Sequence, residues 1–257
     1  MPQPADVSPV KSAQRTVRIL EELAASPTRL TIAELHERTN YPRSSLHALI
    51  RTLRELKWVE ADESGTRFGV GPHALLSGTA YLDRDPALPH ALEALEDLRA
   101  EVGYTTHYAR RDDAYVLYLA SRESRDSART VSRVGRRLPA HITALGQALL
   151  AQLTPAEVDK VLPVELVRYT ADTITRFRDL HTALDGVRER GWVFERGQGT
   201  ESIACVAATV DYRIPATDAI SCSMPVDVSD REVQRVAKAV TAVAQRLAAT
   251  LRLNGIR

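Results

Sequence analysis

Cysteines and long apolar runs are scarce in this chain of 257 residues. Its two cysteines, Cys205 and Cys222, form no CxxC pair and have no zinc-site spacing, so we expect no disulfide framework, no metal and no cofactor. No run of about 18 apolar residues is present, so no membrane-spanning helix is predicted. Residues 1–11 lack the apolar core of a signal peptide. These absences favour a reduced cytoplasmic protein.

Net charge is also scarce, because 34 Lys and Arg residues are balanced by 33 Asp and Glu residues. The charge is unevenly distributed, however. Between Lys11 and Lys57 there are nine Lys and Arg residues and five Glu residues, a local net charge of +4. A basic N-terminal segment on a nearly neutral body is typical of a nucleic-acid-binding module joined to a second domain. The length and the apolar share of 44% allow two folded domains.

The segment from Thr31 to Leu56 predicts two helices joined by a tight turn. Thr31 is followed three residues later by Glu34, which is the spacing of a capping box. Pro42 can begin a new helix but cannot continue the first one. After Pro42 the apolar residues recur at helical spacing, at Leu46, Leu49, Ile50, Leu53 and Leu56. The remaining face is polar and basic near its start, as in the recognition helix of a helix-turn-helix.

Two β-prone runs, 57–60 and 66–70, flank a polar turn at 62–65 and predict a hairpin. A hairpin directly after a recognition helix makes a winged helix. We expect the serines and the histidine at the start of the helix to read base edges, and the arginines to contact phosphates. The expected DNA-binding residues are Arg43, Ser44, Ser45, His47, Arg51 and Arg67. The alternative is a solvated helix pair in a protein-interaction module.

Outside the predicted helix pair and hairpin, the chain predicts further helices and strands. Most of them belong to a second domain of mixed structure. Helices are expected at 12–25, 73–82, 89–102, 144–153, 155–162 and 176–190, and a last one from Ser229. Strands are expected at 105–110, 115–120, 128–134, 192–195, 202–210 and 219–224. This predicts an α+β fold with the following domains: a disordered tail at 1–10, a winged helix-turn-helix at 11–71, a linker helix at 72–85 and a sensor-like domain at 86–257.

Small polar residues on the C-terminal strands predict a ligand pocket. Strand alternation places Ser221 and Ser223 on one face, and Cys205 lies among small residues on the preceding strand. Small side chains on neighbouring strands leave a hollow in which hydroxyl and thiol groups can orient a small polar ligand. The turn from Thr143 to Gly146 begins a helix whose N–H groups suit a carboxylate. The alternative is that Cys205 is an ordinary core residue.

Enzymatic motifs are missing from the sequence. A nucleophile and base could be assembled only from Cys205 with His107 or His141, and no local signature supports such a pair. The segment Gly197-Gln198-Gly199 lacks the third glycine of a dinucleotide-binding loop. We therefore expect a protein that is not an enzyme, and a small-molecule hydrolase is the alternative from another functional class.

With these motifs the chain resembles the IclR family of bacterial transcriptional regulators over nearly its full length. The matching N-terminal stretches are 12–15, 30–35, 43–47 and 68–71, and the matching C-terminal stretches are 138–141, 144–151, 188–192, 202–208 and 219–223. The resemblance implies a homodimeric or homotetrameric repressor or activator that binds a palindromic operator in double-stranded DNA. It also implies a GAF-like domain that binds a small metabolite, commonly an organic acid.

The resemblance also implies which residues line the effector pocket. The matching positions are Thr143, Ala144, Gly146, Cys205, Ser221 and Ser223. Two departures from the family pattern stand out. Gly197-Gln198 replaces a common acidic pair, which leaves Glu195 as the nearest acid, and Ala48 stands in the recognition helix where an arginine is common.

Overall fold

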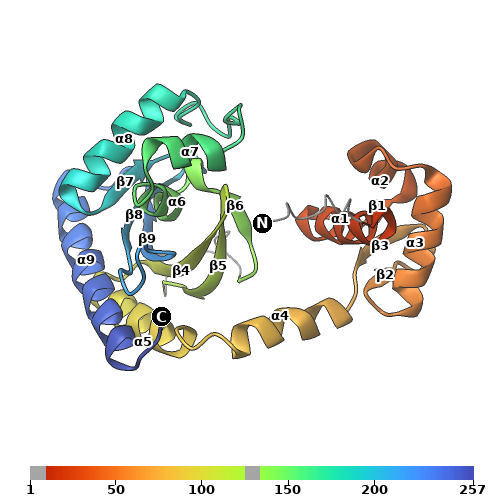
Figure 1. Ribbon diagram of the computed structural model, residues 1–257, viewed down its shortest axis with the longest axis horizontal. Helices are drawn as coiled ribbons and strands as arrows, with labels where there is room; N and C mark the ends of the chain where they lie inside the picture. Colours follow the sequence, from red (N-terminus) through yellow and green to blue (C-terminus); the bar gives the residue numbers. More distant parts are fainter. Residues whose placement is uncertain (1–9, 125–133) are drawn as a thin grey trace, which may run out of the picture. The chain divides into compact units, whose positions relative to one another are not determined.

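The computed structural model describes residues 10–124 and 134–257, and the chain divides into two compact units, Met1–Arg84 and Asp85–Arg257 (Figure 1). The tail expected at 1–10 lies outside the described residues except for Val10. The strand expected at 128–134 also lies outside them except for Val134, which is in a turn. Among the described residues, no helix combines the length and apolarity needed to cross a membrane.

The N-terminal unit is a winged helix-turn-helix, which confirms the predicted fold. Its three strands form a small antiparallel sheet in the order β1-β3-β2. Its elements are α1 (Lys11–Ala25), β1 (Leu30–Thr31), α2 (Ile32–Thr39), α3 (Arg43–Glu55), β2 (Val59–Ala61), β3 (Arg67–Val70) and α4 (His73–Asp83). The apolar stripe of α3 is buried in the core of this unit, at Leu46, Ile50 and Leu53.

Local chemistry explains the turns of this unit. The capping box at the start of α2 is present, because Thr31 Oγ1 accepts from the Glu34 N–H (3.2 Å) and Glu34 Oε2 accepts from the Thr31 N–H (2.7 Å). Helix α2 ends at Asn40, whose φ of 56° is left-handed. In the wing, Asp62 Oδ1 accepts from the N–H groups of Thr66 (3.1 Å) and Arg67 (3.0 Å), which fixes the turn between β2 and β3.

The C-terminal unit is built around a six-stranded antiparallel sheet in the order β6-β5-β4-β9-β8-β7. Its strands are β4 (Thr105–Asp112), β5 (Tyr115–Arg122), β6 (Arg137–Pro139), β7 (Val193–Arg196), β8 (Ile203–Thr209) and β9 (Asp218–Pro225). Helices α5 (Leu88–Val102) and α9 (Asp230–Leu253) pack together and contact the sheet, as Figure 1 shows. The remaining helices are α6 (Ala144–Leu150), α7 (Pro155–Val161) and α8 (Phe177–Arg190), and a 3₁₀ turn covers Ala140–Ile142.

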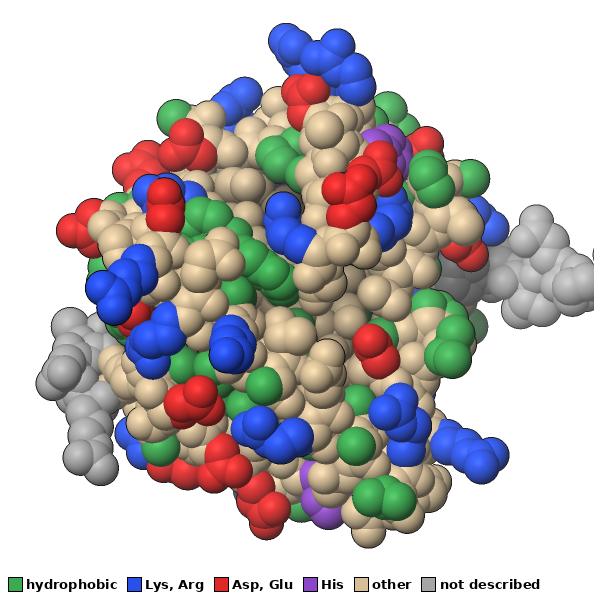
Figure 2. Space-filling model, turned by 90° about the vertical axis from the view of Figure 1, so that its left-hand side faces the viewer, with side chains coloured by type: hydrophobic (Ala, Val, Ile, Leu, Met, Phe, Trp, Pro, Cys, Tyr) green, Lys and Arg blue, Asp and Glu red, His purple; other side chains and the backbone are tan. Residues whose placement is uncertain are grey.

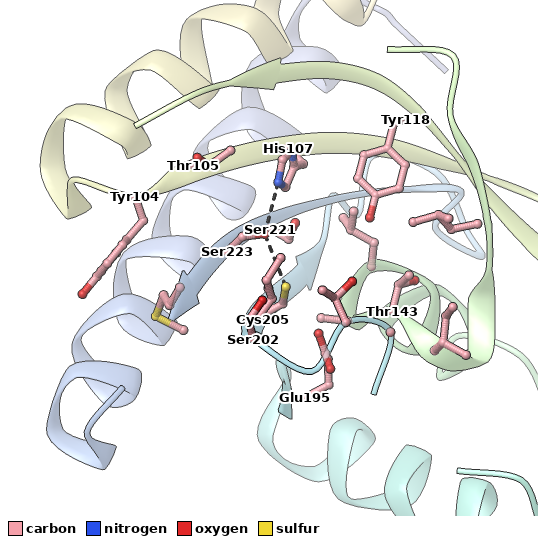
Figure 3. Close-up of a pocket in the computed structure, with 18 of the residues that line it drawn as sticks. Tyr104, Thr105, His107, Tyr118, Thr143, Glu195, Ser202, Cys205, Ser221 and Ser223 are labelled. Atoms are coloured by element: carbon pink, nitrogen blue, oxygen red, sulfur yellow. Dashed lines mark hydrogen bonds between the residues drawn. The ribbon is translucent and has the colours of Figure 1, made fainter. Parts of the chain in front are cut away.

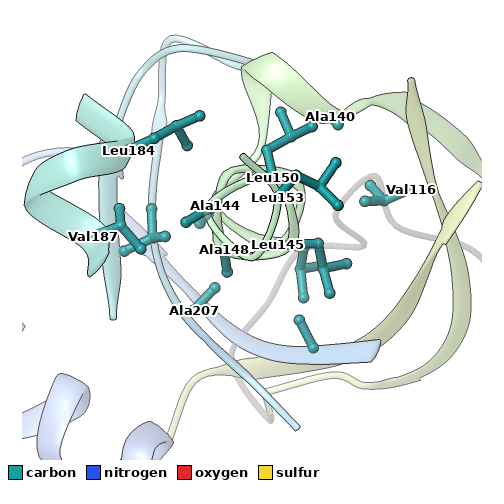
Figure 4. Packing of buried hydrophobic residues seen from close by; sticks show 14 of the residues in the cluster. Val116, Ala140, Ala144, Leu145, Ala148, Leu150, Leu153, Leu184, Val187 and Ala207 are labelled. Atoms are coloured by element: carbon teal, nitrogen blue, oxygen red, sulfur yellow. The ribbon is translucent and has the colours of Figure 1, made fainter. Parts of the chain in front are cut away.

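Helix α6 is buried along its whole length at the centre of the C-terminal core (Figure 4). Ala148 lies toward Ala207 of the sheet, and Leu184 of α8 packs in the same cluster. A Cβ atom at Gly146 would lie 2.2 Å from the Ala140 carbonyl oxygen, so only glycine lets the helix approach the preceding turn so closely. This packing holds the first turn of α6 against the sheet.

Strand register places small residues of three strands beside one another. On β8 and β9, Cys205 pairs with Ser223 and Ala207 pairs with Ser221. On the other side of β9, Ser221 pairs with His107 of β4. The predicted alternation is therefore confirmed, because Ser221 and Ser223 face the same side as Cys205. The antiparallel register gives these residues their common location.

Candidate functional site

A cavity of about 500 Å³ lies inside the C-terminal unit (Figure 3). Its wall takes side chains from all six strands of the sheet, β4 to β9, and from the start of α6. Five of the six expected pocket residues line it: Thr143, Ala144, Cys205, Ser221 and Ser223. Its size suits a small metabolite.

Gly146, the sixth expected pocket residue, does not line the cavity. It lies in the first turn of α6, against Ala140, where its role is close packing. The N–H of Gly146 is also engaged, because it donates to Thr143 Oγ1 (3.0 Å) as the N-cap bond of α6. The sequence pattern named the correct turn but could not distinguish its cavity-facing residues from the one required for packing.

A chain of hydrogen bonds crosses the cavity wall from β5 to β8. His107 Nδ1 lies 2.9 Å from Ser121 Oγ, and its Nε2 lies 3.1 Å from Ser223 Oγ. Ser223 Oγ in turn lies 3.3 Å from Cys205 Sγ (Figure 3). Burial lowers the pKa of His107 to about 4, so the imidazole is neutral at pH 7. Burial and the neighbouring Glu195 raise the pKa of the Cys205 thiol, which keeps it protonated.

Glu195 is a buried acid in the cavity wall that sequence reasoning did not assign to the site. It is 5% exposed and pairs in register with Cys205. Burial raises its pKa to about 7, although its Oε2 accepts a hydrogen bond from the Gln198 N–H (3.0 Å). The Gln198 side chain accepts from Gln147 Nε2 (2.7 Å), which ties this loop to α6. Gln198 therefore orients the one acid that lines the cavity in the described part of the chain.

Two further lining residues were missed in the sequence, Tyr118 of β5 and Arg136 just before β6. Arg136 is the only Lys or Arg side chain among the described residues that line the cavity. The strand pattern of 115–120 was recognised, but alternation alone does not distinguish a tyrosine facing a cavity from one in a packed core. Both residues lie close enough for the positive charge of Arg136 to act on the Tyr118 hydroxyl.

The geometry of the cavity favours binding over catalysis. A thiol is a good nucleophile only as a thiolate, and the raised pKa of Cys205 opposes ionisation. With a pKa of about 4, His107 is also a weak base at neutral pH. Within residues 10–124 and 134–257 no group of three or more His, Cys, Asp and Glu side chains is arranged to hold a metal.

Helix α3 of the N-terminal unit presents the expected DNA-facing residues to solvent, with one exception. Arg43, Ser44, His47 and Arg51 are exposed, as is Ala48. Ser45 is half-buried, and its Oγ accepts from Arg15 Nη1 of α1 (3.2 Å). Of the two serines and the histidine at the start of the helix, Ser44 and His47 are therefore open to a ligand.

Arg67 lies at the start of β3, next to the wing turn, and is exposed. Its guanidinium group is turned back onto its own unit. Nη1 donates to the Arg29 carbonyl oxygen (3.0 Å) and lies 3.7 Å from Glu34 Oε2. A phosphate contact by Arg67 would therefore share the guanidinium with these partners.

Comparisons with known proteins agree on one family. The family model described as IclR helix-turn-helix domain matches residues 12–63, and the model described as bacterial transcriptional regulator IclR C-terminal matches residues 79–249. The chain is 28% identical to the HTH-type transcriptional regulator BhcR of Paracoccus denitrificans, covering 94% of this chain and 88% of that protein. It is also 28% identical to the transcriptional repressor IclR of Escherichia coli, covering 96% and 92%.

Solved structures show the same fold. A transcriptional regulator of this family from Alicyclobacillus acidocaldarius matches with a TM-score of 0.81 and 27% identity, covering 94% of this chain and 99% of that one. An IclR homologue from Microbacterium hydrocarbonoxydans, solved in complex with 4-hydroxybenzoate, matches with a TM-score of 0.76 at 23% identity, covering 94% and 99%. The winged helix, the antiparallel sheet with its cavity and the two matching family models together show that this chain belongs to the IclR family of bacterial transcriptional regulators.

Proposed function

We propose that α3 binds the major groove of an operator. In this proposal the winged helix at 11–71 binds DNA, the domain at 86–257 binds the effector, and the linker helix at 72–85 connects the two. The observation that carries this proposal is the two-sided character of α3. Its apolar side is buried, while Arg43, Ser44, His47 and Arg51 are exposed together. In this arrangement Ser44 and His47 contact base edges, and Arg43 and Arg51 contact phosphates.

The regulator acts as a homodimer or homotetramer on a palindromic operator in cytoplasmic DNA. Helix α4 supports this part of the proposal, because none of its residues is buried. Leu75 and Leu76 are 68% and 64% exposed, which is unusual for two adjacent leucines in a single subunit. A second copy of the chain would cover them, and a twofold dimer matches two operator half-sites.

The effector is a small carboxylate held in the cavity of the C-terminal unit. Arg136 supplies a positive charge to the cavity wall, and the hydroxyl groups of Thr143, Ser221 and Ser223 supply hydrogen bonds. His107 adds no positive charge at neutral pH, since burial keeps it neutral. A protein of this fold was solved in complex with 4-hydroxybenzoate, so the fold accommodates a small acid.

A buried ion network connects the cavity strand β9 to the beginning of the C-terminal unit. Asp218 begins β9, the strand that carries Ser221 and Ser223, and it accepts from Arg110 Nε (2.6 Å). Arg110 Nη1 also pairs with Asp85 (2.7 Å), the last residue of the proposed linker at 72–85 and the first residue of the C-terminal unit. An effector that shifts β9 would act on the linker through this network, with a typical coupling free energy of about 1–3 kcal/mol.

A mobility-shift titration with DNA from the chain's own upstream region tests the proposed DNA-binding helix. Arg43→Ala should weaken binding about tenfold on all sequences and flatten its salt dependence, because one phosphate contact is lost. Arg178→Ala, an exposed arginine of the C-terminal unit, is the matched control and should leave the titration unchanged. Ala48→Arg should strengthen binding by restoring a positive charge at an exposed position of α3.

The face of the C-terminal unit shown in Figure 2 is a poor alternative DNA-binding surface. Lys and Arg side chains on this face are interspersed with Asp and Glu side chains, so no broad positive patch forms there. If Arg43→Ala and Arg178→Ala reduced DNA binding equally, the assignment of α3 would be wrong. If small carboxylates left the operator complex unchanged, the proposed effector class would be wrong.

A further inference from the structure

Two hydroxyl groups in the cavity wall have no hydrogen-bond partner among the described residues. The first belongs to Tyr118, which is 7% exposed and whose hydroxyl points into the cavity in Figure 3. The second belongs to Ser221, which is 2% exposed and also lines the cavity. A hydroxyl group that faces a cavity and makes no hydrogen bond to the protein is available to a ligand, which can supply that bond.

The register of the sheet explains how Tyr118 reaches the cavity. Tyr118 pairs with Ala109 of β4, and Ala109 pairs with Ala219 of β9. These two alanines leave room on the cavity side for the tyrosine ring, which also contacts the edge of the His107 ring at 5.5 Å between centroids. The hydroxyl lies within electrostatic reach of Cys205, Glu195 and Arg136. Tyr118 is therefore held in place by its packing while its polar end faces the ligand space.

The hydrogen-bonding capacity of Tyr118 and Glu195 determines which ligand group can bind near them. Tyr118 can donate one hydrogen bond and accept others, whereas the carboxyl group of Glu195 is mainly an acceptor. A second carboxylate on the ligand would face Glu195, and two carboxylates at close range repel each other. An apolar end would give the Tyr118 hydroxyl no partner and would add none to Glu195, which already accepts from the Gln198 N–H. A hydroxyl group on the ligand satisfies both, because it can donate to Glu195 and accept from Tyr118.

We propose that Tyr118 is the specificity-determining residue of the cavity and that, with Glu195, it selects hydroxycarboxylic acids over the parent acids and over dicarboxylates. This inference rests on the proposed carboxylate effector. It adds a second recognition point, which binds a hydroxyl group of the ligand rather than its carboxylate. Ser221, on β9, lines the same cavity and offers a further bond to the polar ligand.

Calorimetric titration of the full chain with two matched series tests the proposal. One series is benzoate, 4-hydroxybenzoate and terephthalate, and the other is butyrate, 4-hydroxybutyrate and succinate. The wild-type chain should bind the hydroxy acid of at least one series about tenfold or more tightly than the other two members. Tyr118→Phe should remove most of this advantage over the parent acid. Glu195→Gln should narrow the advantage over the dicarboxylate, because it removes the repelling carboxyl group.

Tyr108→Phe is the matched control, since the Tyr108 hydroxyl has no hydrogen-bond partner but is buried away from the cavity, which it does not line. It should leave the order of affinities unchanged, and thermal melting of each variant checks that it is folded. Equal affinity for parent and hydroxy acids, or an unchanged preference in Tyr118→Phe, would overturn the role of Tyr118 while leaving the carboxylate effector in place. Failure of all six acids to bind would overturn the effector class together with this inference.

Discussion

In the N-terminal unit, the exposed residues proposed to bind DNA stand close together on one helix, between Arg43 and Arg51. The cavity of the C-terminal unit instead takes its wall from segments between Gly103 and Pro225. The first site is a surface displayed by a helix whose other side is buried. The second is an interior space that exists only when the six strands of the sheet and the start of α6 are assembled. Substitutions on the exposed face of α3 should therefore change DNA binding with little effect on folding, whereas substitutions in the cavity wall can change both ligand binding and folding.

Acidic residues show the same difference in electrostatic terms. In the winged helix, hydrogen bonds from Thr31 lower the pKa of Glu34, which caps α2 at the surface. In the cavity, burial raises the pKa of Glu195 to about 7. The first acid supports its local fold as an ion. The second is held in a partly protonated state that costs folding free energy and provides polarity for a ligand.

The largest effects on stability are expected from substitutions in the two hydrophobic cores, which test whether the two units unfold independently. Leu46→Ala and Leu149→Ala each remove a side chain that is fully buried, the first in the N-terminal core and the second in the C-terminal core. Each should cost about 2–5 kcal/mol of unfolding free energy in its own unit. Calorimetric melting should show each variant lowering one transition and leaving the other in place. Equal shifts of both transitions by either variant would show that the units do not unfold independently.

A smaller effect is expected from the pH dependence of Glu195. Its pKa is raised from 4.5 to about 7, so the folded chain binds the proton more tightly than the unfolded chain. The stability linked to this proton is fully present below about pH 4.5 and is lost as pH rises toward 7, by at most ~3 kcal/mol. Glu195→Gln should therefore be stabilised relative to wild type at pH 8 and much less so at pH 5.

Thermal melts between pH 5 and pH 8 provide the measurement. The Cys205 thiol and the Tyr118 hydroxyl do not interfere, because burial raises the pKa values of both. His107 titrates identically in both proteins, so its contribution cancels. Glu189→Gln, at an exposed position of α8, serves as the control, and its stability relative to wild type should not increase between pH 5 and pH 8. A constant difference between Glu195→Gln and wild type across this range would contradict the raised pKa.

The smallest effects are expected from two threonines with the same capping role. Thr31 caps α2 and Thr143 caps α6, each by accepting from the N–H three residues later. Removing either hydroxyl by Thr31→Ala or Thr143→Ala should cost about 1 kcal/mol of stability. Only Thr143→Ala should also weaken carboxylate binding in calorimetry, since Thr143 lines the cavity. Equal carboxylate affinity in both variants would remove Thr143 from the proposed site.

Local patterns made the winged helix predictable. The capping box at Thr31, the break at Pro42 and the apolar spacing of α3 act within a few residues, and the structure reproduces each of them. The partial burial of Ser45 was not predictable, because it depends on Arg15 of another helix. The retained contacts of Arg67 with Arg29 and Glu34 likewise join residues that are distant in sequence.

The cavity was predictable only in part. Strand alternation placed Ser221 and Ser223 on one face, since side chains of a strand alternate regardless of the partner strand. Alternation could not reveal that Tyr118 and Glu195 face the same space, because that depends on register and on the order of strands in the sheet. The place of Gly146 depends on the path of the backbone at Ala140.

The sequence alone therefore determined the element types, the exposed polar side of α3 and the resemblance to one family, because helix caps, periodicity and local charge act over short distances. Tertiary structure decided which polar residues share the cavity and how their pKa values shift, because burial and strand pairing join residues far apart in the chain. For the same reason, the hydroxyl of Tyr118 became a candidate for effector recognition only in the folded sheet.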